Sequence, residues 1–147
     1  MRGFPAVIRS GVGYPAGGRL SEEKTMQFAL LIYESPQLFA ARKNDDNDPY
    51  LGAWRAYYQA LVDAGIYSGG DALEVPETGT TVRVQQGRGR VQDGPYADTK
   101  EQLAGLLILE LPSLDAALDW AARCPAASAG AVEVRPLAPE RKLRITG

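Results

Sequence analysis

The chain has 147 residues and a mass of 15.8 kDa, with no histidine, one cysteine and a formal net charge of -2. This length suits one buried core, and the absence of histidine excludes Ser-His-Asp and Cys-His catalysis and imidazole metal ligation. A pI near 5.2 argues against nucleic-acid binding, which normally requires a basic face. Any chemistry must then use carboxylates, lysine, tyrosine, hydroxyl groups, the cysteine or a bound cofactor.

The first 25 residues show no hydrophobic periodicity, and their longest apolar stretch, residues 4–8, is too short for a signal peptide or a membrane span. We interpret residues 1–25 as a flexible N-terminal extension, or as the product of a start codon upstream of a true start at Met26. Residues 138–147 are predicted to be a solvated tail. We expect a cytoplasmic protein that contacts neither membrane nor nucleic acid.

The apolar run of residues 28–33 predicts a central strand buried on both faces. A polar loop follows, with one short helical turn expected in residues 37–42. Asp48 and Pro49 predict a helix start, because Asp caps free amides and Pro fits the first helical position. Gly65 predicts the end of that helix. Its apolar stripe, expected to pack into the core, consists of Leu51, Trp54, Tyr57, Tyr58, Leu61 and Val62.

The segment after this helix is rich in glycine, and residues 71–79 are interpreted as irregular backbone. Residues 80–84 alternate as in a half-exposed strand, which returns through residues 90–91 after a turn at residues 87–89. The arginines of this hairpin, Arg83, Arg88 and Arg90, are interpreted as a solvated edge that discourages strand addition.

Residues 103–111 predict a second apolar strand, and Ser113 predicts the cap of a helix that ends at Pro125. The residues of this helix expected to face inward are Leu114, Ala117, Leu118 and Ala121. Residues 131–136 predict a lateral strand, because Pro136 cannot donate a hydrogen bond to a neighbouring strand. The succession predicts an α+β fold, a ferredoxin-like antiparallel sheet with helices on one face. Its uncovered face predicts a dimer formed sheet to sheet.

Residues 93–102 combine three carboxylates (Asp93, Asp98 and Glu101) with a lysine, a threonine hydroxyl and a phenol. One interpretation is a site in which a carboxylate beside Tyr96 acts on a small polar ligand and Lys100 holds an anionic group. The other is an Asx turn at Asp93 followed by a helix-capping box over residues 98–101. The spacing alone favours this second, structural interpretation.

No metal or cofactor is predicted. The acidic run of residues 45–48 lacks the glycine and the distal glutamate of a calcium loop. Cys124 stands at the expected end of a helix, where the negative end of the helix dipole raises a thiol pKa, and we expect it to be inert.

Several segments in this order follow a known pattern: Tyr33, then residues 69–73, 80–84, 93–105 and 132–136. Together they resemble the YCII-related family, in its DGPF subgroup, over residues 26–137. The resemblance implies a dimeric α/β barrel built from two ferredoxin-like units. It also implies a bacterial stress or regulatory setting, because the genes of this subgroup frequently neighbour sigma-factor genes. The His-Asp pair proposed for other branches of the family cannot be carried over, since this chain has no histidine.

Three hypotheses for function follow. The first is a small-molecule-binding or regulatory dimer with a pocket at the sheet face or interface, in which a polar or anionic metabolite contacts Tyr33, Arg83, Asp93, Tyr96, Thr99 and Lys100. The second is a cofactor-free enzyme, an isomerase or oxygenase, with Asp93 or Glu101 as base and Tyr96 as donor. A catalytic Asp93 should be buried within reach of Tyr96. The third is a scaffold for a partner such as a sigma factor.

Overall fold

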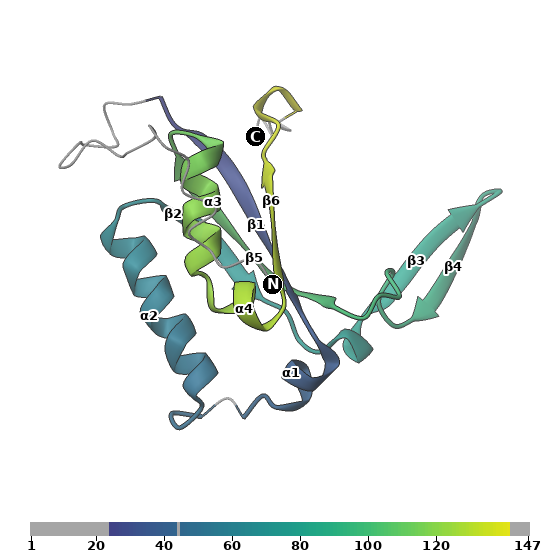
Figure 1. Cartoon of the computed structure of the whole chain (residues 1–147). Helices are drawn as coiled ribbons and strands as arrows, with labels where there is room; N and C mark the ends of the chain where they lie inside the picture. The colour runs from purple at the N-terminus through teal and green to yellow at the C-terminus, as the bar shows by residue number, and fades with distance from the viewer. Residues whose placement is uncertain (1–23, 44, 142–147) are drawn as a thin grey trace.

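Four strands form an antiparallel sheet in the order β2-β5-β1-β6 (Figure 1). The computed structural model describes residues 24–43 and 45–141, so most of the predicted extension and the end of the predicted tail lie outside the described residues. The strands are β1 (Met26–Glu34), β2 (Tyr67–Ala72), β5 (Gln102–Leu111) and β6 (Ala131–Pro136). As predicted, the first apolar strand is central and the last one is lateral.

The helices α2 (Pro49–Asp63) and α3 (Leu114–Arg123) lie together on one face of this sheet (Figure 1). Two shorter helices, α1 (Pro36–Ala40) and α4 (Pro125–Ala129), follow β1 and α3. A hairpin is inserted between β2 and β5, and without it the succession is strand, helix, strand, strand, helix, strand. This α+β arrangement is consistent with the predicted ferredoxin-like fold. No helix of the described residues is long and apolar enough to cross a membrane.

The predicted helix caps are present. The side chain of Asp48 accepts hydrogen bonds from the backbone N–H groups of Tyr50 and Leu51, and the side chain of Ser113 accepts one from Ala116. Gly65 follows α2 with a φ of 71°, a conformation that costs glycine little. These local signals position both long helices against the sheet.

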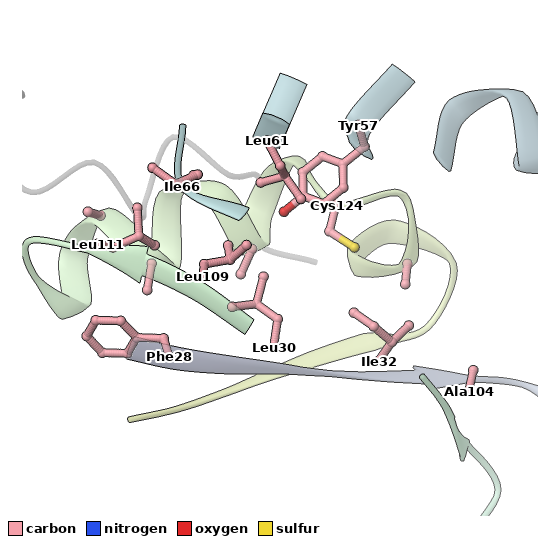
Figure 2. Packing of buried hydrophobic residues seen from close by; sticks show 14 of the residues in the cluster. Phe28, Leu30, Ile32, Tyr57, Leu61, Ile66, Ala104, Leu109, Leu111 and Cys124 are labelled. Carbon is pink, nitrogen blue, oxygen red and sulfur yellow. The ribbon is translucent and has the colours of Figure 1, made fainter. Parts of the chain in front are cut away.

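Buried and half-buried side chains alternate along β1, and the buried ones form part of the core. Phe28, Leu30 and Ile32 are buried beneath the helices, whereas Ala29 and Leu31 on the opposite face are only half-buried. The prediction of a strand buried on both faces is therefore wrong for a single chain. We call this second side, opposite α2 and α3, the open face. The largest buried side chains, several of them shown in Figure 2, are Phe28, Leu30, Leu61, Ile66, Leu109 and Leu111.

Both helices bury a narrower stripe than their apolar residues predict. In α2, Tyr57 and Leu61 are buried, but Tyr58 and Val62 are exposed. In α3, the buried residues are Ala116, Ala117 and Ala121, and Leu114 is 48% exposed, contrary to prediction. Small side chains on this helix let it pack closely on the large aliphatic side chains of the sheet.

Strand β2 falls partly within the segment predicted to be irregular, so that prediction is wrong for Asp71 and Ala72. The glycines hide this strand from pattern analysis, but they are what allows it to pair. Gly70 has a φ of 156°, and a Cβ there would overlap the carbonyl oxygen of Leu106 in the neighbouring strand. Only glycine permits this close approach of two backbones.

The inserted hairpin consists of β3 (Thr80–Gln85) and β4 (Arg88–Asp93), which form a separate two-stranded sheet. Its turn residues are Gln86 and Gly87, both with positive φ (52° and 75°), as a tight two-residue hairpin turn requires. The turn therefore lies one position earlier than predicted, because Arg88 and Gly89 already pair with β3. Figure 1 shows the hairpin projecting from one end of the sheet, away from α2 and α3.

Candidate functional site

The loop between β4 and β5, residues 94–101, is held by the side chain of the residue that follows it. The amide of Gln102 donates to the carbonyl oxygens of Ala97 and Thr99, at 3.0 and 2.7 Å, and the hydroxyl of Thr99 donates to the carbonyl of Glu101. A strand begins directly after the loop, so the predicted helix-capping box over residues 98–101 is wrong. We call residues 94–101 the motif loop.

Glu101, the last residue of the motif loop, places one carboxylate oxygen in a buried position. Its Oε2 is inaccessible to solvent and has no hydrogen-bond partner among the described residues. Nearby, Gly130 leaves space: a Cβ there would lie 3.3 Å from Oε2 and would overlap the carbonyl oxygen of Tyr33. A buried acceptor without a partner typically costs about 1–3 kcal/mol. The buried Oε2 of Glu101 is therefore a destabilising feature of the motif loop, and the fold offers no hydrogen bond within the described residues to compensate for it.

Tyr33 begins a chain of polar contacts on the open face. Its hydroxyl donates to Oε1 of Glu133 at 3.4 Å, and Oε2 of Glu133 accepts from Nε of Arg135 at 2.6 Å. This hydrogen bond to the Glu133 carboxylate raises the pKa of Arg135. The polar chain adjoins aliphatic residues of the same face, which are half-buried: Ala29, Leu31, Leu106 and Ile108.

Two of the predicted ligand residues, one in β3 and one in the motif loop, form an exposed pair. The guanidinium of Arg83 lies 4.9 Å from the ring centroid of Tyr96, at cation–π distance, and Tyr96 is 73% exposed. Asp93 at the end of β4 and Lys100 in the motif loop are also exposed. Asp93 thus lacks the burial that its proposed catalytic role requires.

The predicted residues therefore divide into separate groups. Arg83 contacts Tyr96, Thr99 contacts Glu101, and Tyr33 contacts Glu133 instead of another predicted residue. Glu101 and Gly130 lie where β1 ends and where β5 and β6 begin. We call this region, with Tyr33, Glu101 and Gly130, the sheet end.

A second buried carboxylate was not predicted. Glu34, 4% exposed, accepts hydrogen bonds from the hydroxyl of Tyr50 at 2.7 Å and from Arg42 at 3.2 Å. Arg42 also donates to the carbonyl of Leu73. Burial, aided by the hydrogen bond to Glu34, raises the pKa of Tyr50. The available signal was positional: Glu34 continues the i, i+2 series of buried β1 residues that includes Ile32. Its carboxylate joins three segments of the chain and has its partners, so we assign it a structural role.

Cys124 lies between α3 and α4, and Figure 2 shows its thiol beside the ring of Tyr57. Burial raises the pKa of this thiol to about 11, whereas the backbone N–H groups of Ala126 and Ala127 lower it. The predicted direction is confirmed, but its predicted cause is wrong. Cys124 caps the N-terminal end of α4, so the local backbone favours the thiolate, and desolvation outweighs that effect.

The acidic run before α2 has local roles. Asp45 accepts a hydrogen bond from the backbone of Asn47, and Asp48 caps the helix. Among residues 24–43 and 45–141, no cluster of three or more His, Cys, Asp or Glu side chains is placed to hold a metal ion.

The chain has an α+β fold consistent with a ferredoxin-like arrangement, and its sequence matches a known family. Residues 26–141 match the YCII-related domain, and the chain belongs to that family. An uncharacterised protein of Rhizobium meliloti (strain 1021) is 38% identical over 116 residues, which cover 77% of this chain and 93% of that protein. The family predicted from the residues is thereby confirmed, while its DGPF subgroup stays a prediction.

Proposed function

We propose that this YCII-related protein is a small-molecule-binding homodimer whose ligand site lies at the sheet end. The observation that carries the proposal is the buried Oε2 of Glu101, which lacks a partner in the described chain. Oε2 is closed off from solvent in this structure, so a ligand N–H or O–H group supplies the missing hydrogen bond once the motif loop shifts to admit it. Because the acceptor belongs to a carboxylate, that bond is stronger than one between neutral groups. The ligand class is therefore a polar metabolite with at least one donor.

The open face supports both the dimer and the pocket. Leu31, Leu106 and Ile108 leave an aliphatic surface half-buried, and a second copy packed on it by two-fold symmetry removes this surface from water. The polar chain from Tyr33 to Arg135 lies on the same face. An apolar wall with a few oriented polar groups is typical of small-molecule sites. A role in sigma-factor regulation, in a bacterial cytoplasm, belongs to this proposal and rests on the family resemblance.

Three proteins purified in parallel from the encoding organism test the ligand site: wild type, Glu101→Leu and Asp93→Asn. Each is denatured, and the small molecules released are compared by mass spectrometry. Leucine fills the space of Glu101 but accepts no hydrogen bond, so we expect Glu101→Leu to retain at least tenfold less ligand than wild type. Asp93 is exposed, so Asp93→Asn should retain as much as wild type. Equal retention by all three proteins contradicts the proposal.

The buried Oε2 also favours a second candidate, a cofactor-free enzyme of the isomerase or oxygenase type with Glu101 as base. One oxygen of Glu101 is buried and has no partner in the described chain, whereas Asp93 is exposed, so Glu101 is the better placed of the two predicted bases. Tyr96, the predicted donor, is 73% exposed in the single chain. Incubating the wild-type protein with the retained compound distinguishes the two functions: an enzyme converts it, and a binding protein returns it unchanged.

A further inference from the structure

The β3–β4 hairpin has two chemically different faces. In its register, Val82 lies opposite Val91, and Val84 lies opposite Gly89. Directly opposed residues of an antiparallel pair share a face, so these valines form one apolar surface. The intervening pairs, Arg83 with Arg90 and Gln85 with Arg88, carry the polar and basic side chains on the other face. We call residues 80–93 the hairpin arm and its apolar surface the valine face.

The valine face has no cover within the described chain. Val82 is 63% exposed, and Val84 and Val91 are each 70% exposed. No residue of the hairpin arm belongs to the hydrophobic core cluster or packs against it. A two-stranded hairpin alone in water is marginally stable, and it gains stability when one face packs on another surface. The arm therefore has both an apolar surface and a physical reason to have it covered.

Charge favours a second copy of this chain as the cover. The hairpin arm contains three arginines and one aspartate, whereas the rest of residues 26–141 contains 15 acidic and seven basic residues. The open face is acidic on balance, because its side of the sheet carries Asp71, Glu110 and Glu133 and one basic residue, Arg135, which pairs with Glu133. A basic arm and an acidic body attract each other over distance. The arginines lie on the face of the arm opposite the valine face, so this attraction does not act through ion pairs beneath the valines. The arm projects away from its own helices, so the body it can reach is that of another copy (Figure 1).

We infer that the hairpin arm clasps a second copy of the chain, with the valine face packed beside the open face of the partner. Two-fold symmetry makes the contact reciprocal, so each protomer contributes one arm and receives one. This inference rests on the homodimer proposed above and adds the element that holds it together. It also gives the basic cluster of the hairpin a role in attracting a partner, beyond the predicted solvated edge.

Sedimentation equilibrium over a dilution series tests the arm. The Val82→Ser/Val91→Ser double variant removes apolar surface from exposed positions, so the sheet core stays intact, as circular dichroism should confirm. We expect its dimer dissociation constant to rise at least tenfold. The matched control, Gln85→Ser/Gln92→Ser, changes exposed residues on the other face of the same arm, and its constant should stay within twofold of wild type. A valine variant that dimerises like wild type overturns the inference.

Photocrosslinking locates the contact. Val84→Cys is labelled with a benzophenone maleimide, while Cys124, 3% exposed, stays protected by burial. Irradiating a mixture of ¹⁴N- and ¹⁵N-labelled chains should join chains of different isotope through β1, β5 or β6. Crosslinks confined to single chains overturn the arm while leaving the dimer and the ligand site standing. A wild type that is monomeric throughout the dilution series overturns the arm and the homodimer together.

Discussion

The carboxylate of Glu101 lies above Gly130, where a Cβ would be 3.3 Å from Oε2. The same Cβ would overlap the carbonyl oxygen of Tyr33, so the glycine lets β6 begin close to the end of β1. Gly130 thus allows β1 and β6 to approach each other closely, and it leaves room for the buried Oε2 of Glu101. The candidate site and the stability of the sheet end are consequently linked.

Gly130→Ala should destabilise the fold by about 1–3 kcal/mol, because backbone must shift to accommodate the methyl group. Urea unfolding followed by circular dichroism measures the change. Gly52→Ala is the matched control, since a Cβ at Gly52 in α2 meets no atom within 4 Å. Its free energy of unfolding should not fall below that of wild type, because alanine favours a helix more than glycine does. Equal effects of the two substitutions contradict the close approach.

Glu101→Leu should stabilise the fold while it abolishes ligand retention. Replacing a buried acceptor that has no partner with an apolar side chain removes a desolvation cost, and we expect a gain of about 1 kcal/mol. Glu74→Leu, which replaces an exposed carboxylate outside the sheet, is the control and should change stability little. A loss of several kcal/mol in Glu101→Leu means that the carboxylate supports the fold, contrary to the account.

Tyr50→Phe should cost about 2 kcal/mol. The substitution removes one hydroxyl, and the buried carboxylate of Glu34 loses its 2.7 Å hydrogen bond. Tyr58→Phe removes a hydroxyl from the same helix at a position that is 47% exposed, and it should be neutral. Thermal unfolding of both variants at pH 7 gives the comparison, and a Tyr50→Phe variant as stable as wild type rules out a structural role for this pair.

Alkaline pH should weaken the fold through Cys124. Burial raises its pKa from an ordinary value of 9.0 to about 11, so the unfolded chain releases the proton at lower pH than the folded chain. The stability contributed by the protonated thiol is complete below about pH 9 and is lost as the pH rises to about 11. Between pH 8 and pH 10.5 we expect this residue to account for about 1–2 kcal/mol.

Urea unfolding of wild type and Cys124→Ala at both pH values measures this contribution. It is the loss of unfolding free energy between the two pH values in wild type, minus the same loss in Cys124→Ala. The pKa values of Tyr50 and Tyr57 are raised mainly by burial, which both proteins share, so their contributions largely cancel. An equal pH dependence in the two proteins shows that the thiol does not take part.

The fold was largely predictable because its signals are local. Apolar runs marked β1 and β5, and Asp48 and Ser113 marked helix starts through hydrogen bonds that span only a few residues. Strand β2 was not predicted because Gly69 and Gly70 have no side chain to form a pattern. The close approach that requires glycine, at Gly70, is visible only in the sheet.

The candidate site was less predictable because it depends on contacts distant in sequence. Arg83 and Tyr96 were grouped with Tyr33, but they contact each other, whereas Tyr33 contacts Glu133 in β6. Glu101 was among the predicted bases, yet only the position of Gly130 across the fold reveals its burial. The sequence of the motif therefore identified both Glu101 and Asp93 as candidate bases, but it could not show that Glu101 is the one with a buried oxygen.

Native mass spectrometry of the wild-type protein, purified from the encoding organism, tests the central claim most directly, because it reports the number of chains and any bound molecule together. The account predicts a dimer with additional mass from a small polar molecule in each protomer. A monomer without additional mass contradicts it.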